Sequence, residues 1–135
     1  MRNCVLIFGF AIAFCCPAIA SADDWSIDIT GAAQVEETET GALKIKVTGI
    51  QYATPANPGS WRIQAILVGF DESVYTITSL ISGSSQSQGT TTADFSGTPV
   101  PPQTYIARVD IEKNVGTMIP EWQSQAHDDQ TIFAP

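Results

Sequence analysis

Hydrophobic and polar residues alternate along much of this chain, which is the period expected for β-strands with one buried face. The alternation is clearest over residues 25–30, 43–48 and 105–112. Residues 61–68 carry apolar side chains on both faces, which is typical of a central strand. No segment after residue 22 shows helical periodicity, so the pattern predicts an all-β chain.

Weaker signals predict the remaining strands. Residues 74–81 are rich in β-branched side chains, residues 90–95 predict a short edge strand, and residues 130–133 predict a closing strand. Residues 36–41 predict a loop or a short irregular edge strand, and residues 82–89, built from Gly, Ser and Gln, predict a mobile loop. About seven short strands separated by turns predict an antiparallel β-sandwich.

The alternating apolar positions predict one hydrophobic core. Its predicted members are Trp25, Ile27, Ile29, Leu43, Ile45, Val47, Trp61, Ile63, Leu67, Tyr105, Ala107, Val109 and Ile111.

Residues 1–22 have the pattern of a cleaved secretory signal. Arg2 provides the positive start, residues 4–16 form the apolar stretch, and Pro17 precedes a small-residue cleavage site. A membrane anchor is the alternative, but a span needs about 20 apolar residues. We therefore expect one domain, residues 23–135, that is secreted or periplasmic and is not inserted in a membrane.

Composition narrows the chemistry. The chain has 14 Asp and Glu against 6 Lys and Arg, a net charge of −8, which argues against a nucleic-acid partner. All three cysteines, Cys4, Cys15 and Cys16, lie in the predicted signal, and the only histidine is His127. The mature chain therefore has no disulfide, no thiolate and no multi-histidine metal site. Without a serine elbow motif as well, the sequence predicts a protein that is not an enzyme and has no catalytic residues.

Two aromatic positions are similar to those of immunoglobulin-like domains. Trp61 lies on the third long strand, where such domains place a tryptophan between the sheets. Tyr105 opens the penultimate strand, where its hydroxyl can return to nearby backbone in a tyrosine corner. The same two positions also resemble fibronectin type III domains.

A longer stretch, from Leu43 to the end, resembles the bacterial cell-adhesion-related family called CARDB. The matching segments are residues 80–85 (LISGSS), 102–110 (PQTYIARVD) and 119–121 (IPE). This resemblance implies an immunoglobulin-like sandwich that takes part in adhesion.

Trp122 is the leading candidate for recognition, because an indole face can stack on a sugar ring or anchor a protein contact. We expect it to lie in a polar loop between the last two strands, together with Glu121, His127, Asp128 and Asp129. The alternative is that Trp122 folds back onto the open end of the sandwich.

No cofactor is predicted, although calcium stays open as a metal. The oxygen ligands that calcium prefers are available at Asp23, Asp24, Glu121, Asp128 and Asp129. The chain contains no EF-hand loop.

These observations predict an exported, non-enzymatic, immunoglobulin-like binding or adhesion module. Its partner would be a protein or a polysaccharide at or outside the bacterial surface. A carbohydrate-binding module that uses Trp122 is the first alternative. A pilus-type or structural subunit that pairs by strand addition at edge strands such as residues 90–95 is the second. The sequence leaves the oligomeric state open.

Overall fold

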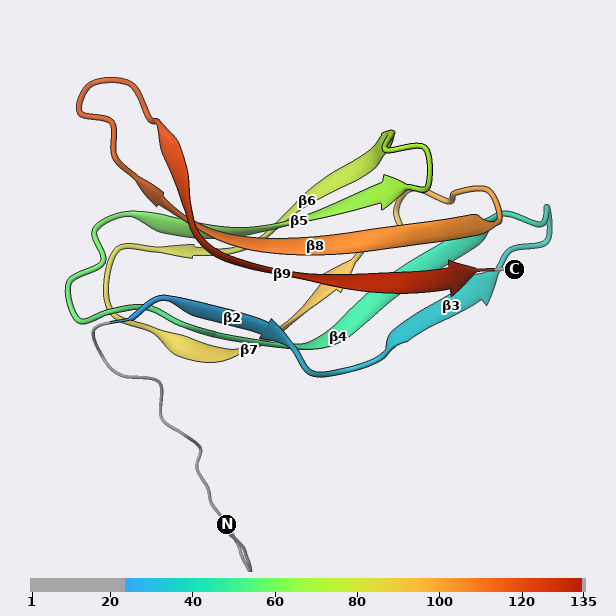
Figure 1. Cartoon of the computed structure of the whole chain (residues 1–135), viewed down its shortest axis with the longest axis horizontal. Helices are drawn as coiled ribbons and strands as arrows, with labels where there is room; N and C mark the ends of the chain where they lie inside the picture. Colours follow the sequence, from blue (N-terminus) through green and yellow to red (C-terminus); the bar gives the residue numbers. More distant parts are fainter. Residues whose placement is uncertain (1–23, 135) are drawn as a thin grey trace, which may run out of the picture.

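A computed structural model describes residues 24–134, which form two antiparallel β-sheets packed face to face (Figure 1). In the first sheet, β2 and β3 both pair with β4, and β7 also pairs with β4. The second sheet has the order β6-β5-β8-β9. The strands are β2 (Ser26–Ile29), β3 (Ala33–Glu37), β4 (Leu43–Ala53), β5 (Trp61–Gly69), β6 (Val74–Gly83), β7 (Gln88–Asp94), β8 (Gln103–Asn114) and β9 (Trp122–Ala134).

This topology confirms the predicted all-β, immunoglobulin-like sandwich. The chain passes from one sheet to the other between β4 and β5, between β6 and β7, and between β7 and β8. The described residues form eight strands, whereas the sequence predicted about seven. The additional strand is residues 33–37, which pair with β4 as an exposed edge strand. Within residues 24–134, no helix has the length and apolar character to cross a membrane.

The two aromatic positions that suggested this fold behave as predicted. Trp61 is only 2% exposed and lies in the core, where its Nε1 donates to the Ser85 carbonyl at 3.0 Å. Tyr105 is fully buried, and its hydroxyl donates to the carbonyl of Pro101, four residues upstream. This contact is the geometry of a tyrosine corner, and it fixes the chain where β8 begins.

The inward alternation of both sheets fills one core, as expected. All predicted core residues are buried except Trp25 and Ile29, which pack half-buried at its margin. The predicted list omitted Ala65, although it lies on the inward face of the run 61–68, and it omitted further core members that lie on short segments or beyond the alternating runs. The omitted members are Ile50, Ala65, Ala93, Phe95, Val100, Ile132 and Ala134.

Two glycines allow β2 and β3 to share one side of β4. Gly49 has a φ of 70°, and a Cβ there would lie 2.5 Å from the backbone nitrogen of Gly31. A Cβ on Gly31 would in turn lie 2.3 Å from the Thr48 carbonyl oxygen. Only glycine fits this close backbone approach, which lies where β2 has ended and β3 has not begun.

The predicted loop over residues 82–89 is too long. Strand β6 continues to Gly83 and β7 begins at Gln88, so the connection spans only residues 84–87. Gly83 packs against the indole of Trp61, where a Cβ would come within 2.9 Å of the ring. The small residues of this segment therefore serve close packing as well as turning.

Candidate functional site

The largest correction concerns the last strand. We expected residues 121–129 in a loop and a strand only over 130–133, but β9 begins at Trp122. The alternating pattern is absent from most of this strand, because polar Asp128 and Gln130 occupy inward positions where an apolar residue is expected. The Ile29 amide donates to Asp128 Oδ2 at 2.8 Å, and Gln130 Nε2 donates to the Gly31 carbonyl at 3.0 Å. The two polar side chains thus hydrogen-bond to backbone groups at the end of β2 and just after it, and they belong to a strand and not to a loop.

The structure therefore separates the five predicted binding residues. Asp128 faces inward, whereas His127 and Asp129 lie on the outer face of β9. Asp129 accepts two hydrogen bonds from Arg108, at 2.8 and 3.1 Å, and these bonds lower the pKa of the Asp129 carboxyl. Glu121 lies in the loop before β9. Of the five residues, Trp122 lines a groove.

Trp122 forms one wall of an open groove of about 520 Å³. Arg62 on β5 lies against it, with the guanidinium carbon 4.2 Å from the centre of the Trp122 ring. This distance is within the range of a cation–π contact. The other residues that line the groove come from the start of β5 and the end of β6 and are Ser60, Trp61, Ser79, Leu80, Ile81, Ser82 and Gly83.

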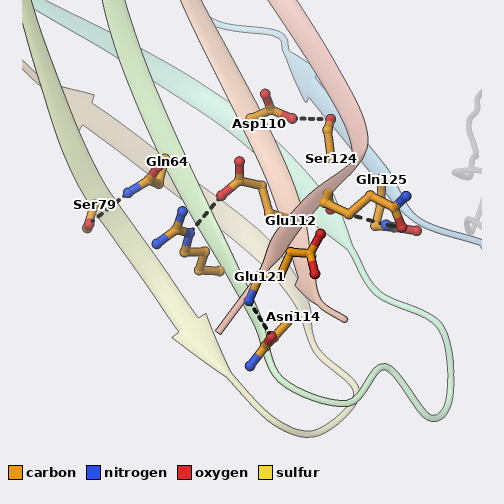
Figure 2. Close-up of polar contacts among 10 residues, drawn as sticks. Gln64, Ser79, Asp110, Glu112, Asn114, Glu121, Ser124 and Gln125 are labelled. Atoms are coloured by element: carbon orange, nitrogen blue, oxygen red, sulfur yellow. Dashed lines mark hydrogen bonds and ion pairs between the residues drawn. The ribbon is translucent and has the colours of Figure 1, made fainter. Parts of the chain in front are cut away.

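Hydrogen-bonded polar side chains continue from the groove across the outer face of the β6-β5-β8-β9 sheet (Figure 2). Arg62 Nε donates to Glu112 Oε1 at 2.6 Å, and these two residues are directly opposite on β5 and β8. Gln64 Nε2 is 3.5 Å from Ser79 Oγ. Asp110 accepts a hydrogen bond from the hydroxyl of Ser124. Both arginines of this face are thus paired with carboxylates.

The loop between β8 and β9, residues 115–121, projects from the sandwich (Figure 1). It leads directly into Trp122, which lines the groove. Asn114 holds the loop closed, because its Oδ1 accepts from the amides of Gly116 at 2.9 Å and of Glu121 at 3.0 Å. The amide of Val115 also donates to the Glu121 carbonyl at 2.8 Å. We refer to residues 115–121 as the β8–β9 loop.

The tip of this loop is apolar and almost fully solvated. Met118 is 95% exposed and Ile119 is 79% exposed. Sequence periodicity could not detect them, because two apolar residues between Thr117 and Pro120 form no repeating pattern. The available signal was their position between the two last strands, where loops of sandwiches carry binding residues.

Ser124 and His127, the residue types of a nucleophile and a base, are not hydrogen-bonded to each other. Ser124 donates to Asp110 instead of to an imidazole, although His127 lies opposite Asp110 on β9. A serine nucleophile needs its hydroxyl on the base, which is not the arrangement here. Among residues 24–134, no three His, Cys, Asp or Glu side chains gather to hold a metal ion, and Asp23 of the calcium prediction lies outside the described residues.

Comparison with known proteins assigns no relative. No family model matches the chain, and no curated protein or solved structure is significantly similar to it. The resemblances to CARDB and to fibronectin type III domains therefore stay predictions. Because a sandwich fold hosts many functions, the functional argument rests on the groove and the β8–β9 loop.

Proposed function

We propose that this protein is an exported, non-enzymatic binding module that recognises a macromolecule at or outside the bacterial surface. Its recognition site would combine the groove beside Trp122 with the β8–β9 loop. The observation that carries this proposal is the exposure of Met118 and Ile119 at the tip of a loop closed by Asn114.

The shape of the loop supports this role. Burial of exposed apolar side chains by a partner favours binding by about 25 cal/mol for each Å² removed from water. The hydrogen bonds to Asn114 order the loop before binding, so association loses less conformational entropy than with a floppy loop. Trp122 lies directly behind the loop and offers an aromatic anchor of the kind that dominates interfaces.

The groove favours a polysaccharide as a second candidate ligand. A half-exposed indole lies there beside the hydroxyl groups of Ser79 and Ser82. Sugar rings stack on indole faces, and their hydroxyls bond to such polar side chains. The guanidinium of Arg62 donates through Nε to Glu112, so its terminal amino groups add further donors near the groove.

Cell binding and a glycan array test the proposal and separate the two ligands. Fluorescently labelled mature protein, residues 23–135, is applied to intact bacterial cells and to immobilised polysaccharides. For a protein partner, the double variant Met118→Ser/Ile119→Ser should bind cells at least tenfold more weakly. For a polysaccharide, Trp122→Ala should abolish the array signal while the loop variant retains it.

Phe70→Ser is the matched control, because Phe70 is 82% exposed and lies in the turn after β5, at the other end of the sandwich from the β8–β9 loop. Equal loss of binding in Phe70→Ser would contradict the proposed site. Absence of wild-type binding to cells and glycans alike would contradict the proposed function.

Export is a separate part of the proposal and has its own measurement. It rests on the sequence pattern of residues 1–22, which lie outside the described residues. Mass spectrometry of the protein expressed in a bacterial host should find an N-terminus at Asp23 in the periplasm or medium. An uncleaved chain in the cytoplasm would contradict export.

A further inference from the structure

The second half of the same sheet surface has a different character. On the outer face of β6-β5-β8-β9, six apolar side chains lie together at the end away from the groove. We call this surface the apolar sheet face, and it consists of Ile66, Val68, Val74, Ile77, Ile106 and Phe133.

The strand register shows that these side chains are neighbours. Val74 lies opposite Val68, and Val68 lies opposite Ile106, so the three form one row across three strands. Ile77 lies opposite Ile66 in the adjacent row. Phe133 follows two residues after Thr131, which is the partner of Ile106, and so lies diagonal to Ile106. Directly opposite residues of paired strands point to the same side of a sheet, so the face is continuous.

Within the described part of the chain, this apolar surface is left open to solvent. The exposed fractions are 58% for Val74, 56% for Ile77, 40% for Ile106 and 78% for Phe133. The ion pair of Arg108 with Asp129 borders the face, in the same row as Ile66. An apolar centre with a polar border is the anatomy of a protein interface, and clustered exposed apolar residues mark such sites.

We propose that a second copy of this chain covers the apolar sheet face in a two-fold symmetric dimer. Charge argues for this occupant. The chain carries a net charge of −8, so most of its surface repels an identical copy. The six residues of the face are uncharged, and the acid at its border, Asp129, is neutralised by Arg108. A basic partner would instead be attracted to the acidic surface elsewhere.

The size of the surface fits a weak dimer. The apolar sheet face occupies about half of the outer face: four strands about 4.8 Å apart and the last five residues of β5 at about 3.3 Å each give roughly 300 Å² per copy. Two copies would bury roughly 600 Å², which is below the area of stable specific interfaces and in the range of weak, transient contacts. In a two-fold contact each face packs against itself, so an apolar patch meets an apolar patch. This inference does not depend on the proposed function of the groove and loop.

Sedimentation equilibrium of the mature chain, from low to high micromolar concentration, tests the proposal. All described strands and core residues lie between residues 26 and 134, within the mature chain. The wild-type protein should change from monomer to dimer mass as concentration rises. Ile77→Asp and Ile77→Lys should each raise the dissociation constant by ~10-fold or more, because both place an unpaired charge in an apolar contact.

Ile119→Asp is the matched control, since it makes the same change at an exposed residue outside the apolar sheet face. It should dimerise as the wild type does. The use of both charge signs at Ile77 separates burial from net charge, because lysine lowers the overall repulsion between copies. A wild-type chain that stays monomeric, a dimer insensitive to both Ile77 variants, or strengthening by Ile77→Lys would each overturn the proposal. Circular dichroism of every variant confirms that the fold is retained.

Discussion

Along β5 the outward side chains change from Arg62 and Gln64 to Ile66 and Val68, and the outer face of the sheet changes with them. Near Arg62, charged and amide groups are hydrogen-bonded to one another around a groove. Near Val68, apolar groups are exposed and lack any cover in residues 24–134. Two adjacent regions of one sheet surface therefore have opposite chemistry.

The inward residues do not change in this way. Trp61, Ile63, Ala65 and Leu67 are all nearly or fully buried along the length of β5. Core packing therefore constrains one face of the strand throughout, while the other face is free to specialise. The two regions therefore differ in the chemistry of their outer face, while the core below them is uniformly apolar.

The largest predicted effect comes from the core below both regions. Leu67→Ala should lower the free energy of unfolding by about 2–5 kcal/mol, because a fully buried leucine leaves a cavity. The outward Val68→Ala should cost under about 1 kcal/mol when the protein is monomeric. Urea unfolding measures both. Similar losses of unfolding free energy at the two positions would show that the outward side chains stabilise the fold as much as the core side chains do.

The apolar region should make thermal stability depend on protein concentration. A dimer that binds only folded chains raises the midpoint of unfolding as concentration increases. The midpoint of the wild type should therefore rise across a hundredfold concentration range, whereas that of Ile77→Asp should stay constant. A wild-type midpoint that does not change with concentration would contradict dimerisation through the apolar region.

The polar region should contribute a smaller, local coupling. Arg62 and Glu112 have side chains 29% and 17% exposed, so their ion pair is half-buried. A double-mutant cycle with Arg62→Met and Glu112→Gln should give a coupling of about 0.5–1 kcal/mol. The same cycle measured by dimer dissociation should give no coupling. Coupling in the dimer assay would place the polar region inside the interface.

The Arg108–Asp129 ion pair at the border of the two regions should make the smallest contribution to stability, and only at a pH where Asp129 is ionised. Arg108 lowers the pKa of Asp129 in the folded chain, so the ionised carboxylate stabilises the fold above its unfolded pKa of about 3.9. This contribution is lost as the pH falls through the lowered pKa. Because both side chains are more than 40% exposed, it should stay below about 1 kcal/mol.

Asp129→Asn tests this border contribution. The variant should be slightly less stable than the wild type at pH 6, and the difference should vanish as the pH is lowered well below 4. A difference that grows toward acid would reverse the predicted sign.

Sequence periodicity predicted the inward half of the molecule well. Strands β4, β5 and β8 alternate regularly because their inward positions are uniformly apolar. The predicted tyrosine corner is also present, since the Tyr105 hydroxyl bonds to the Pro101 carbonyl. Strand β9 was mostly missed because Asp128 and Gln130 replace apolar residues where they bind the backbone of a neighbouring segment. That exchange depends on tertiary contacts, which a local pattern does not contain.

The candidate site was only partly predictable for a related reason. Trp122 was found from its chemistry, but its groove is built with residues of β5 and β6 that are distant in the sequence. The apolar sheet face was missed because outward Val74 and Ile77 look like core residues of a β-branched strand. Their exposure follows from the β6–β5 register, including its two irregularities.

A dilution series followed by nuclear magnetic resonance tests most directly whether the two regions act separately. Backbone amide shifts of the mature chain are recorded from high to low micromolar concentration. The account predicts concentration-dependent shifts at Ile66, Val68, Ile77 and Ile106, with none at Trp122. Shifts centred on Trp122 or on the β8–β9 loop, or no shifts anywhere, would contradict it.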